Sequence, residues 1–345
     1  MTDLLVVGGG PVGLVAGIEA SRRGLHVVLV EPRDTPIDKA CGEGLMPGTL
    51  SLLRGLGVDP PGRDMAGIRY LTADGRCSAP HLFARGSGRG VRRTELQQAL
   101  AARAEAGGVR CVRDRVVRLV QDGARVRAHL AGGDVVEAPW ALGCDGLHSS
   151  VREHVGVRAA TDGRRFGLRR HARVAPWTDL VEVHWGHGAE AYVTPVADDE
   201  VGVAVLGPRG LGFAGALEQF PALRHRLSGA SWTTEVRGAG PLRQRVAARA
   251  RDRVLLVGDA SGYVDALTGE GLRVGLAGAV AAVDAVLTGR PGRYEREWRR
   301  LTREYRWLTS SLVGATRVRP VRRAIVPAAA ALPAVFGGLV EQLAR

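Results

Sequence analysis

The apolar positions of the first residues follow the pattern of a strand, a helix and a second strand. Residues 4–7 form a short apolar run, which is typical of a strand buried in a parallel sheet. Glycines follow directly, and residues 14–23 then carry apolar side chains at helical spacing up to Gly24. Residues 26–30 form a second apolar run that ends at Glu31. The pattern therefore predicts a βαβ unit.

Further along the chain, helical and alternating patterns are separated by turn signals. Helices are expected over residues 47–56, 94–106 and 271–287. A hairpin is expected over residues 67–83, with Asp74-Gly75 as its turn, and a β-meander over residues 109–142, with turns at Asp122-Gly123 and Gly132-Gly133. Alternating runs predict an antiparallel sheet within residues 165–250, and residues 254–257 read as another buried strand. The chain after residue 290 reads as helical, broken by Pro320, Pro327 and Pro333.

Composition indicates an ordinary folded protein of about two domains, or one domain with an insertion. The chain has 345 residues, of which 45% are hydrophobic and 24% charged. Its formal net charge is +13, but Lys39 is its only lysine and the arginines are scattered. Short arginine clusters occur at residues 92–93, 164–165, 169–170, 299–300 and 322–323. We interpret these as a solvated basic surface, and no nucleic-acid partner is expected.

The cysteines and the apolar segments favour a cytoplasmic protein without a metal. The cysteines are Cys41, Cys77, Cys111 and Cys144, and they show no C-x-x-C spacing, so no zinc site is expected. The N-terminus has no secretory signal pattern. The longest apolar stretch, residues 324–340, contains two prolines, so no transmembrane helix is predicted.

A dinucleotide-binding motif lies in the first βαβ unit. Gly8-x-Gly10-x-x-Gly13 follows a strand and opens a helix, and the next strand ends at Glu31, 18 residues beyond Gly13. The helix N-terminus offers unpaired N–H groups to a pyrophosphate, and Glu31 offers a carboxylate to the ribose hydroxyls. Because that carboxylate repels a 2′-phosphate, the motif favours FAD or NAD over NADP.

Two further motifs narrow the choice of cofactor. Residues 143–152 read Gly-Cys-Asp-Gly-Leu-His-Ser-Ser-Val-Arg, and residues 254–262 read Val-Leu-Leu-Val-Gly-Asp-Ala-Ser-Gly, with Thr-Gly-Glu-Gly at 268–271. With the glycine turn, this set resembles the FAD-dependent oxidoreductases of the p-hydroxybenzoate hydroxylase (group A) and geranylgeranyl reductase superfamily. The resemblance covers about residues 1–290 and implies FAD as cofactor.

The resemblance also implies roles for individual residues. The ADP half of FAD would be held by the glycine turn, and the family arginine near the pyrophosphate corresponds to Arg93. Asp259 would bind the ribityl hydroxyls, and the helix opened at Gly269 and Gly271 would face the isoalloxazine, where its dipole favours the reduced flavin. In the family, the residues that correspond to Asp145 and Gly146 are linked with reduction of the flavin by nicotinamide. The full expected cofactor set is Gly8, Gly10, Pro11, Val12, Gly13, Glu31, Arg33, Arg93, Asp145, Gly146, Gly258, Asp259, Gly269 and Gly271.

The segment 38–47, Asp-Lys-Ala-Cys-Gly-Glu-Gly-Leu-Met-Pro, resembles the Lys-x-Cys-Gly-x-Gly segment of the geranylgeranyl reductase branch. In that branch the segment lies beside the flavin and the substrate cavity. Cys41 and Glu43 are the candidate catalytic residues. Cys41 is expected to line the flavin pocket. Glu43 is expected either to donate a proton or to line the same pocket. The expected substrate pocket comprises Lys39, Cys41, Met46, Trp185, Tyr192 and Pro195.

The superfamily uses reduced flavin in two ways, for oxygenation and for reduction of prenyl double bonds. The reductase branch often carries Tyr-x-Trp-x-Phe-Pro, whereas residues 192–195 read Tyr-Val-Thr-Pro and lack its Trp and Phe. No tryptophans show the Trp-x-Trp spacing of flavin halogenases. The sequence therefore favours a monooxygenase of specialised metabolism. A prenyl reductase and a non-catalytic flavin-binding protein are the alternatives.

The predicted reactants are a hydrophobic aromatic or prenylated molecule, O2, and NADPH or NADH, with a separate flavin reductase as a possible partner. The predicted fold is α/β, a Rossmann-type, glutathione-reductase-like FAD-binding domain interleaved with an antiparallel substrate sheet and followed by C-terminal helices. The FAD-binding domain is assigned residues 1–58, 91–155 and 250–289. The substrate domain is assigned residues 59–90 and 156–249. Helices from residue 290 to 345 are expected to pack over the substrate domain rather than bind a membrane.

Overall fold

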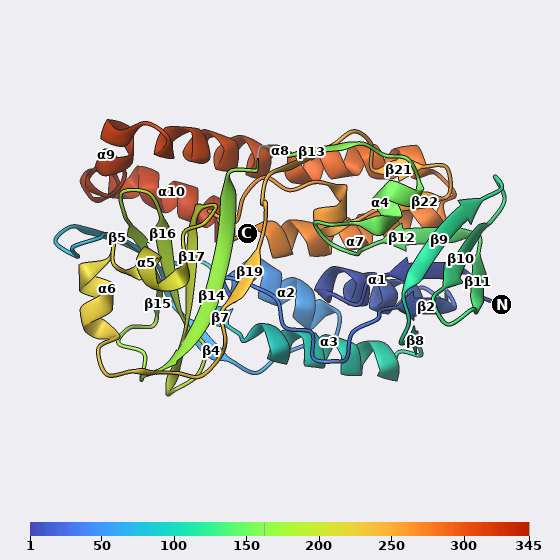
Figure 1. The fold of residues 1–345 in the computed structure, drawn as a ribbon, viewed down its shortest axis with the longest axis horizontal. Coiled ribbons are helices and arrows are strands. Elements are labelled where there is room, and N and C mark those ends of the chain that lie inside the picture. Colours follow the sequence, from blue (N-terminus) through green and yellow to red (C-terminus); the bar gives the residue numbers. More distant parts are fainter. Residues whose placement is uncertain (162, 345) are drawn as a thin grey trace.

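The N-terminal βαβ unit forms as predicted. Strands β1 (Leu4–Val7) and β2 (Val27–Val30) pair in parallel, with Leu4 opposite Val27, and helix α1 (Pro11–Arg22) connects them. The structure is a computed structural model that describes residues 1–161 and 163–344. In it, two large sheets lie side by side along the long axis, and helices cover their faces (Figure 1).

The first sheet has six strands, and the βαβ unit lies inside it. Its order is β21 (Ala250–Arg251), β22 (Val254–Leu256), β12 (Trp140–Gly143), β1, β2 and β8 (Arg110–Val112). All neighbours are parallel except β21, which pairs antiparallel with β22. Burial on both faces explains the continuous apolar runs of its strands.

Different elements cover the two faces of this sheet. On one face, Leu4 and Val6 pack against α1, α3 (Arg93–Ala106) and α7 (Gly271–Leu287). On the other face, Leu5 and Val7 pack against a three-stranded meander formed by β9 (Val116–Gln121), β10 (Val126–Leu130) and β11 (Val135–Ala138). The predicted meander was too long, because its first and last strands, β8 and β12, join the parallel sheet instead.

The second sheet is mainly antiparallel, as predicted. Its order is β18 (Ser231–Trp232), β14 (Arg165–Arg173), β17 (Glu200–Pro208), β16 (Glu190–Pro195), β15 (Leu180–Trp185), β5 (Gly67–Thr72) and β6 (Ser78–Leu82), with β19 (Arg237–Ala239) also on β14. The predicted hairpin is the β5–β6 pair, and β5 joins β15 in parallel. The residue boundaries of the three predicted units stay a prediction.

Smaller elements connect the two sheets. They are α2 (Pro47–Gly55), α4 (Ser150–His154), the single turn η1 (Gly258–Ser261), a three-stranded sheet of β3 (Gly44–Leu45), β7 (Gly88–Gly90) and β4 (Arg63–Met65), and the pair β13 (Ala159–Thr161) with β20 (Gln244–Val246). Helices α5 (Phe213–Leu217) and α6 (Pro221–Arg226) cover one face of the second sheet.

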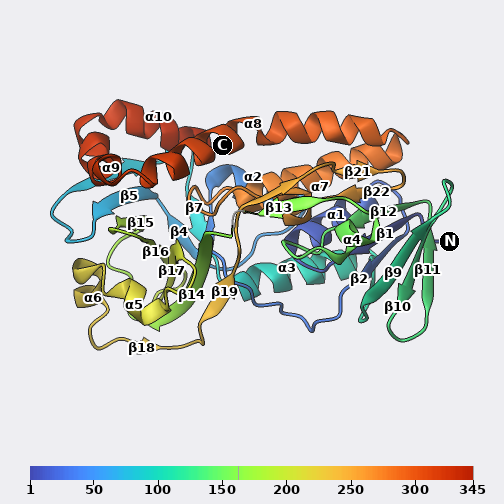
Figure 2. The same cartoon turned by 45° about the horizontal axis from the view of Figure 1, so that its top comes forward.

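Three C-terminal helices cover the other face of the second sheet. They are α8 (Pro291–Thr316), α9 (Arg319–Ala331) and α10 (Pro333–Ala344). The long α8 crosses from the first sheet to the second (Figure 2), and α9 and α10 pack against the hairpin of β5 and β6. Pro327 does not break the helix, contrary to the prediction, because it lies inside α9. The break comes at Leu332, directly before Pro333.

Candidate functional site

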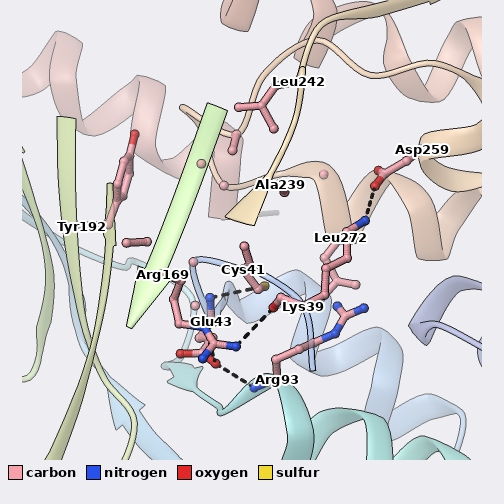
Figure 3. A pocket seen from close by; sticks show the side chains of 18 of the residues that line it. Lys39, Cys41, Glu43, Arg93, Arg169, Tyr192, Ala239, Leu242, Asp259 and Leu272 are labelled. Carbon is pink, nitrogen blue, oxygen red and sulfur yellow. Dashed lines mark hydrogen bonds and ion pairs between the residues drawn. The ribbon is translucent and has the colours of Figure 1, made fainter. Parts of the chain in front are cut away.

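A cavity of about 600 Å³ lies at the carboxyl ends of β1, β12 and β22 and extends to the second sheet. This edge of a parallel sheet is where α/β folds bind ligands. The predicted site residues at its wall are Gly10, Pro11, Val12, Arg33, Lys39, Cys41, Glu43, Met46, Arg93, Asp145, Gly146, Tyr192, Asp259, Gly269 and Gly271. Segments far apart in the sequence therefore meet at one place (Figure 3).

The glycine turn brings the backbone of α1 to the cavity. Gly8 has φ +107°, and a Cβ on Gly13 would lie 1.9 Å from the Gly8 carbonyl oxygen, so neither position accepts a side chain. Gly8 and Gly13 themselves do not line the cavity but set the shape of the turn behind it. No side chain caps α1 at Gly10, so its first N–H groups remain available to a ligand.

Glu31 stands at the carboxyl end of β2, next to the turn. Its Oε2 accepts a hydrogen bond from the Gly9 N–H at 2.8 Å, and its Oε1 accepts one from Arg33 Nε at 2.7 Å. Burial raises the pKa of Glu31, but the hydrogen bonds from Arg33 and Gly9 outweigh it, so the pKa lies below its ordinary value. Arg33 lines the cavity and Glu31 stands directly behind it.

Among the buried polar atoms at the cavity that lack a hydrogen-bond partner within the described residues, two belong to the expected cofactor set. They are Arg93 Nε and Asp145 Oδ1. The other oxygen of Asp145 accepts hydrogen bonds from Ser150 Oγ at 3.2 Å and from the Val151 N–H at 3.0 Å. Within residues 1–161 and 163–344, the Arg93 guanidinium pairs with no carboxylate. Such atoms require a partner that the folded chain does not supply.

Asp259 and Lys39 meet on one side of the cavity, where Lys39 Nζ lies 3.2 Å from Asp259 Oδ2 (Figure 3). Gly269, with φ +70°, and Gly271 line the cavity at the N-terminus of α7, which no side chain caps. Gly258 lies behind the wall, where a Cβ would come 3.1 Å from Val12.

The far end of the cavity is apolar. The second sheet and the C-terminal helix supply Ile68, Tyr70, Val181, Val183, Leu206, Val340 and Leu343. Tyr192 also faces the cavity, and its hydroxyl donates a hydrogen bond to the Leu267 carbonyl at 2.7 Å. This end of the cavity therefore presents an apolar surface with few free polar groups to a ligand.

Trp185 and Pro195 are absent from the cavity wall that the structure describes. Trp185 follows Val181 and Val183 on the same face of β15, but it lies past the chamber and packs against Tyr70, with ring centroids 5.3 Å apart. On β16, Tyr192 and Thr194 face the cavity, so the alternation of the strand turns Pro195 to the opposite side.

Glu43 is part of a buried network that the sequence did not reveal. Its Oε2 lies 2.7 Å from His171 Nε2, and its Oε1 accepts a hydrogen bond from the Arg93 N–H at 2.9 Å. Arg169 Nη1 lies 3.1 Å from His171 Nδ1, and Arg169 Nη2 donates to Asp38. Glu43 and Arg169 line the cavity.

The network corrects the interpretation that all the arginine clusters lie on a solvated surface. Arg169 was interpreted as part of a solvated surface, but it is 1% exposed. Arg165 and Arg322, from two other clusters, pair with the buried Glu190 at 2.7 and 2.6 Å. For Arg165 and Arg169, the only sequence signal was their alternation with apolar residues in a strand, which does not identify partners so distant in sequence.

Comparison with known proteins identifies the family. The FAD binding domain family matches residues 1–290. The chain belongs to this family. Its fold and motifs place it in the group A superfamily expected from the sequence, among FAD-dependent oxidoreductases.

Three similar proteins illustrate the range of this superfamily. Dialkyldecalin synthase of Streptomyces rugosporus is 28% identical over 81% of this chain, which spans 64% of that protein. Menaquinone reductase of Mycolicibacterium smegmatis is 28% identical over 88% of this chain and 80% of that protein. The structure of p-nitrophenol 4-monooxygenase from Pseudomonas putida has a TM-score of 0.80, with 16% identity over 99% of this chain and 95% of that one, and shows the shared fold.

The residues at the cavity fit FAD. The uncapped N-terminus of α1 and the unpaired Arg93 guanidinium lie together, since a Cβ on Gly10 would meet only Arg93 Nη2, at 3.9 Å. These groups would hold the pyrophosphate of FAD. Asp259 and Lys39 would meet the ribityl chain, and the uncapped N-terminus of α7 would face the ring.

Proposed function

We propose that this FAD-binding protein is a monooxygenase that hydroxylates or epoxidises a hydrophobic aromatic or prenylated molecule. The observation that supports the proposal best is the apolar chamber beyond the predicted flavin positions, walled by Ile68, Val181, Val183, Val340 and Leu343. Oxygenation requires a shaped cavity that excludes water, and the cofactor carries the difficult chemistry.

In the overall reaction, one oxygen atom of O2 enters the substrate and the other leaves as water, while NADPH or NADH supplies two electrons. FAD, held by the glycine turn, Arg93 and Asp259, would supply the electron transfer to dioxygen. The reductant acts on this protein directly or through a separate flavin reductase. The N-terminus of α7, with Gly269 and Gly271 at the cavity, stabilises negative charge there.

The residues of the chain would position the substrate and manage protons. The aliphatic wall binds an apolar body, and Tyr192 gives it an aromatic face, since the Tyr192 hydroxyl is already bonded to Leu267. Glu43 lines the cavity and is paired with the buried His171, so Glu43 provides a group that can hold or release a proton near the reacting atoms.

The test uses the purified FAD-loaded protein with NADPH or NADH and a series of 4-alkylphenols of increasing chain length. We expect the longer members to stimulate nicotinamide oxidation and to give a product that carries one atom from isotope-labelled O2. Nicotinamide oxidation without labelled product from any member of the series would contradict the proposal for this substrate class. Failure to bind added FAD would instead support a non-catalytic role.

Reduction of a prenyl double bond is the second candidate. Lys39, Cys41, Gly42 and Gly44, which resemble the reductase segment, all line the cavity. Menaquinone reductase is also among the relatives matched over most of the chain. The discriminating experiment is incubation of the reduced protein with geranylgeranyl diphosphate under argon, where a product heavier by two hydrogens supports reduction and unchanged substrate supports oxygenation.

A further inference from the structure

The C-terminal helices leave a large apolar area uncovered. Every residue from 324 to 340 is apolar or glycine. The exposed ones are Ala324, Pro327, Ala328, Ala330, Ala331, Leu332, Pro333, Ala334, Val335, Gly338 and Leu339. Val335 is 59% exposed and Leu332 56%. Soluble monomers rarely expose contiguous apolar patches of this kind unless the patch meets a partner.

Neighbouring elements extend this area. Helices α9 and α10 contact each other, and both contact β6, whose Leu82 is 63% exposed. Val321, near the start of α9, is 44% exposed. We call Leu82, Val321, Leu332, Val335 and Leu339, with the exposed small residues of 324–340, the C-terminal apolar surface. It lies at the end of the molecule opposite the β9–β11 meander (Figures 1 and 2).

The charged side chains of residues 305–340 are all arginines, and Glu341, which follows this stretch, pairs with His81. No Asp or Glu occurs from residue 305 to residue 340. Arg317, Arg319 and Arg323 in this stretch are exposed. An apolar area bordered by exposed arginines complements an anionic phospholipid surface, whose interior accepts the apolar side chains and whose headgroups attract the guanidinium groups.

The length of α9 and α10 and the bend between them favour a position along a bilayer over a crossing of it. No single helix in the described part of the chain is both long and apolar enough to cross a membrane. Only taken together do helices α9 and α10 have the length and apolar composition needed to cross a membrane, and they are bent by 100° relative to each other. Short apolar helices of this kind bind in the interface plane.

Helix α10 also forms part of the cavity wall. Val340 and Leu343 line the cavity, whereas Val335 and Leu339 face outward. Phe336 packs inward against Tyr70, with ring centroids 4.8 Å apart. The expected packing over the second sheet thus holds for one side of α10, and the other side belongs to the C-terminal apolar surface.

We propose that the C-terminal apolar surface docks on anionic phospholipid bilayers. Docking would place α10, whose Val340 and Leu343 line the cavity, between the bilayer and the cavity. The docking goes beyond the proposed function and does not depend on which reaction the flavin performs.

The test measures flotation of the FAD-loaded full chain with two kinds of vesicle, phosphatidylcholine alone and phosphatidylcholine mixed with phosphatidylglycerol. We expect binding to the mixed vesicles that weakens with added salt, and much weaker binding to phosphatidylcholine alone. Arg323→Glu should lower partitioning by about fivefold or more, because it replaces an attracted charge with a repelled one. Val335→Glu should lower it at least as much.

Matched controls come from the opposite end of the molecule. Val117→Glu and Arg118→Glu alter an exposed apolar residue and an exposed arginine of β9 and should leave vesicle binding unchanged. Circular dichroism confirms that each variant is folded. Absence of binding to both vesicles, or equal loss in the controls, would overturn the proposal. A dimer in sedimentation that Val335→Glu dissociates, without vesicle binding, would assign the surface to a second copy of the chain.

Discussion

Glu43, at the cavity wall, faces the buried His171, with Oε2 and Nε2 2.7 Å apart, although their positions in the sequence differ by 128. A guanidinium only donates hydrogen bonds, so His171 Nδ1 accepts from Arg169 Nη1 at 3.1 Å. The imidazole proton therefore lies on Nε2, which donates to the Glu43 carboxylate. This bond joins the segment before α2 to strand β14 of the second sheet.

The first prediction concerns the strength of this pair. His171→Ala removes a donor from a carboxylate that is 3% exposed, so we expect a loss of about 3 kcal/mol in the free energy of unfolding. Glu43→Gln combined with His171→Ala should cost less than the sum of the single variants, by about 1 kcal/mol or more. Urea unfolding measures the free energy of unfolding of the two single variants and of the double variant. His26→Ala, which breaks an exposed pair with Asp3, is the control, and additive losses would contradict the coupling.

The second prediction separates cofactor binding from folding at two glycines of one motif. Gly10 has φ −69°, and a Cβ there would meet only Arg93 Nη2, at 3.9 Å. Gly10→Ala should therefore leave the stability of the apoprotein within about 0.5 kcal/mol, but lower FAD affinity at least about tenfold, because the methyl group occupies the pyrophosphate position. Gly13→Ala should lower both stability and affinity. Thermal melts and FAD titration measure the two effects, and unchanged FAD affinity in Gly10→Ala would contradict the assigned pyrophosphate site.

The sequence could indicate that the expected cofactor residues meet at one edge of the sheet, because their signals are local. The turn at Gly8, the acidic residue at Glu31 and the Asp259 that follows β22 each depend on a few neighbouring residues, and parallel strands bring their carboxyl ends to one edge. The strands of the two sheets were predictable for the same reason, because apolar runs and alternating runs are also local patterns.

The substrate side was not predictable in the same way, because its contacts join distant segments. Arg169 and Arg170 are consecutive on β14, where one side chain is buried and the other is not. The sequence alone does not say which face of a strand is covered, nor that Arg169 forms ion pairs with Asp38 and Glu43. Trp185 failed as a pocket residue for a related reason, since the cavity ends before its position on β15.

The third prediction uses the lowered pKa of Glu31. A carboxylate whose pKa is lower in the folded state stabilises the fold above its unfolded pKa, about 4.5, and loses this contribution as the pH falls through the folded value. Glu31→Gln should therefore cost about 2 kcal/mol at neutral pH, and the difference from the parent should shrink below pH about 4.5. Urea unfolding of the apoproteins at several pH values tests this. Asp34→Asn, which removes a carboxylate from an exposed ion pair with Arg113, is the control, and a difference for Glu31→Gln that is constant with pH would contradict the prediction.

The fourth prediction concerns two neighbouring arginines of α9. Arg322 is buried, donates from Nε to the Gly186 carbonyl at 2.6 Å, and pairs with Glu190 Oε1 at 2.6 Å. Arg322→Met leaves that carbonyl without this donor and a fully buried carboxylate without one of its ion-pair partners, so we expect a loss of about 3 kcal/mol and faster proteolysis at the start of α9.

Arg323, the next residue, is exposed, and Arg323→Met should change the free energy of unfolding by less than about 0.5 kcal/mol. The same variant should weaken binding to phosphatidylglycerol-containing vesicles, because it removes a charge that faces the headgroups. Urea unfolding and vesicle flotation of both variants should therefore assign an anchoring role to Arg322 and a surface role to Arg323. Equal losses of stability in the two variants would show that α9 is not held through Arg322.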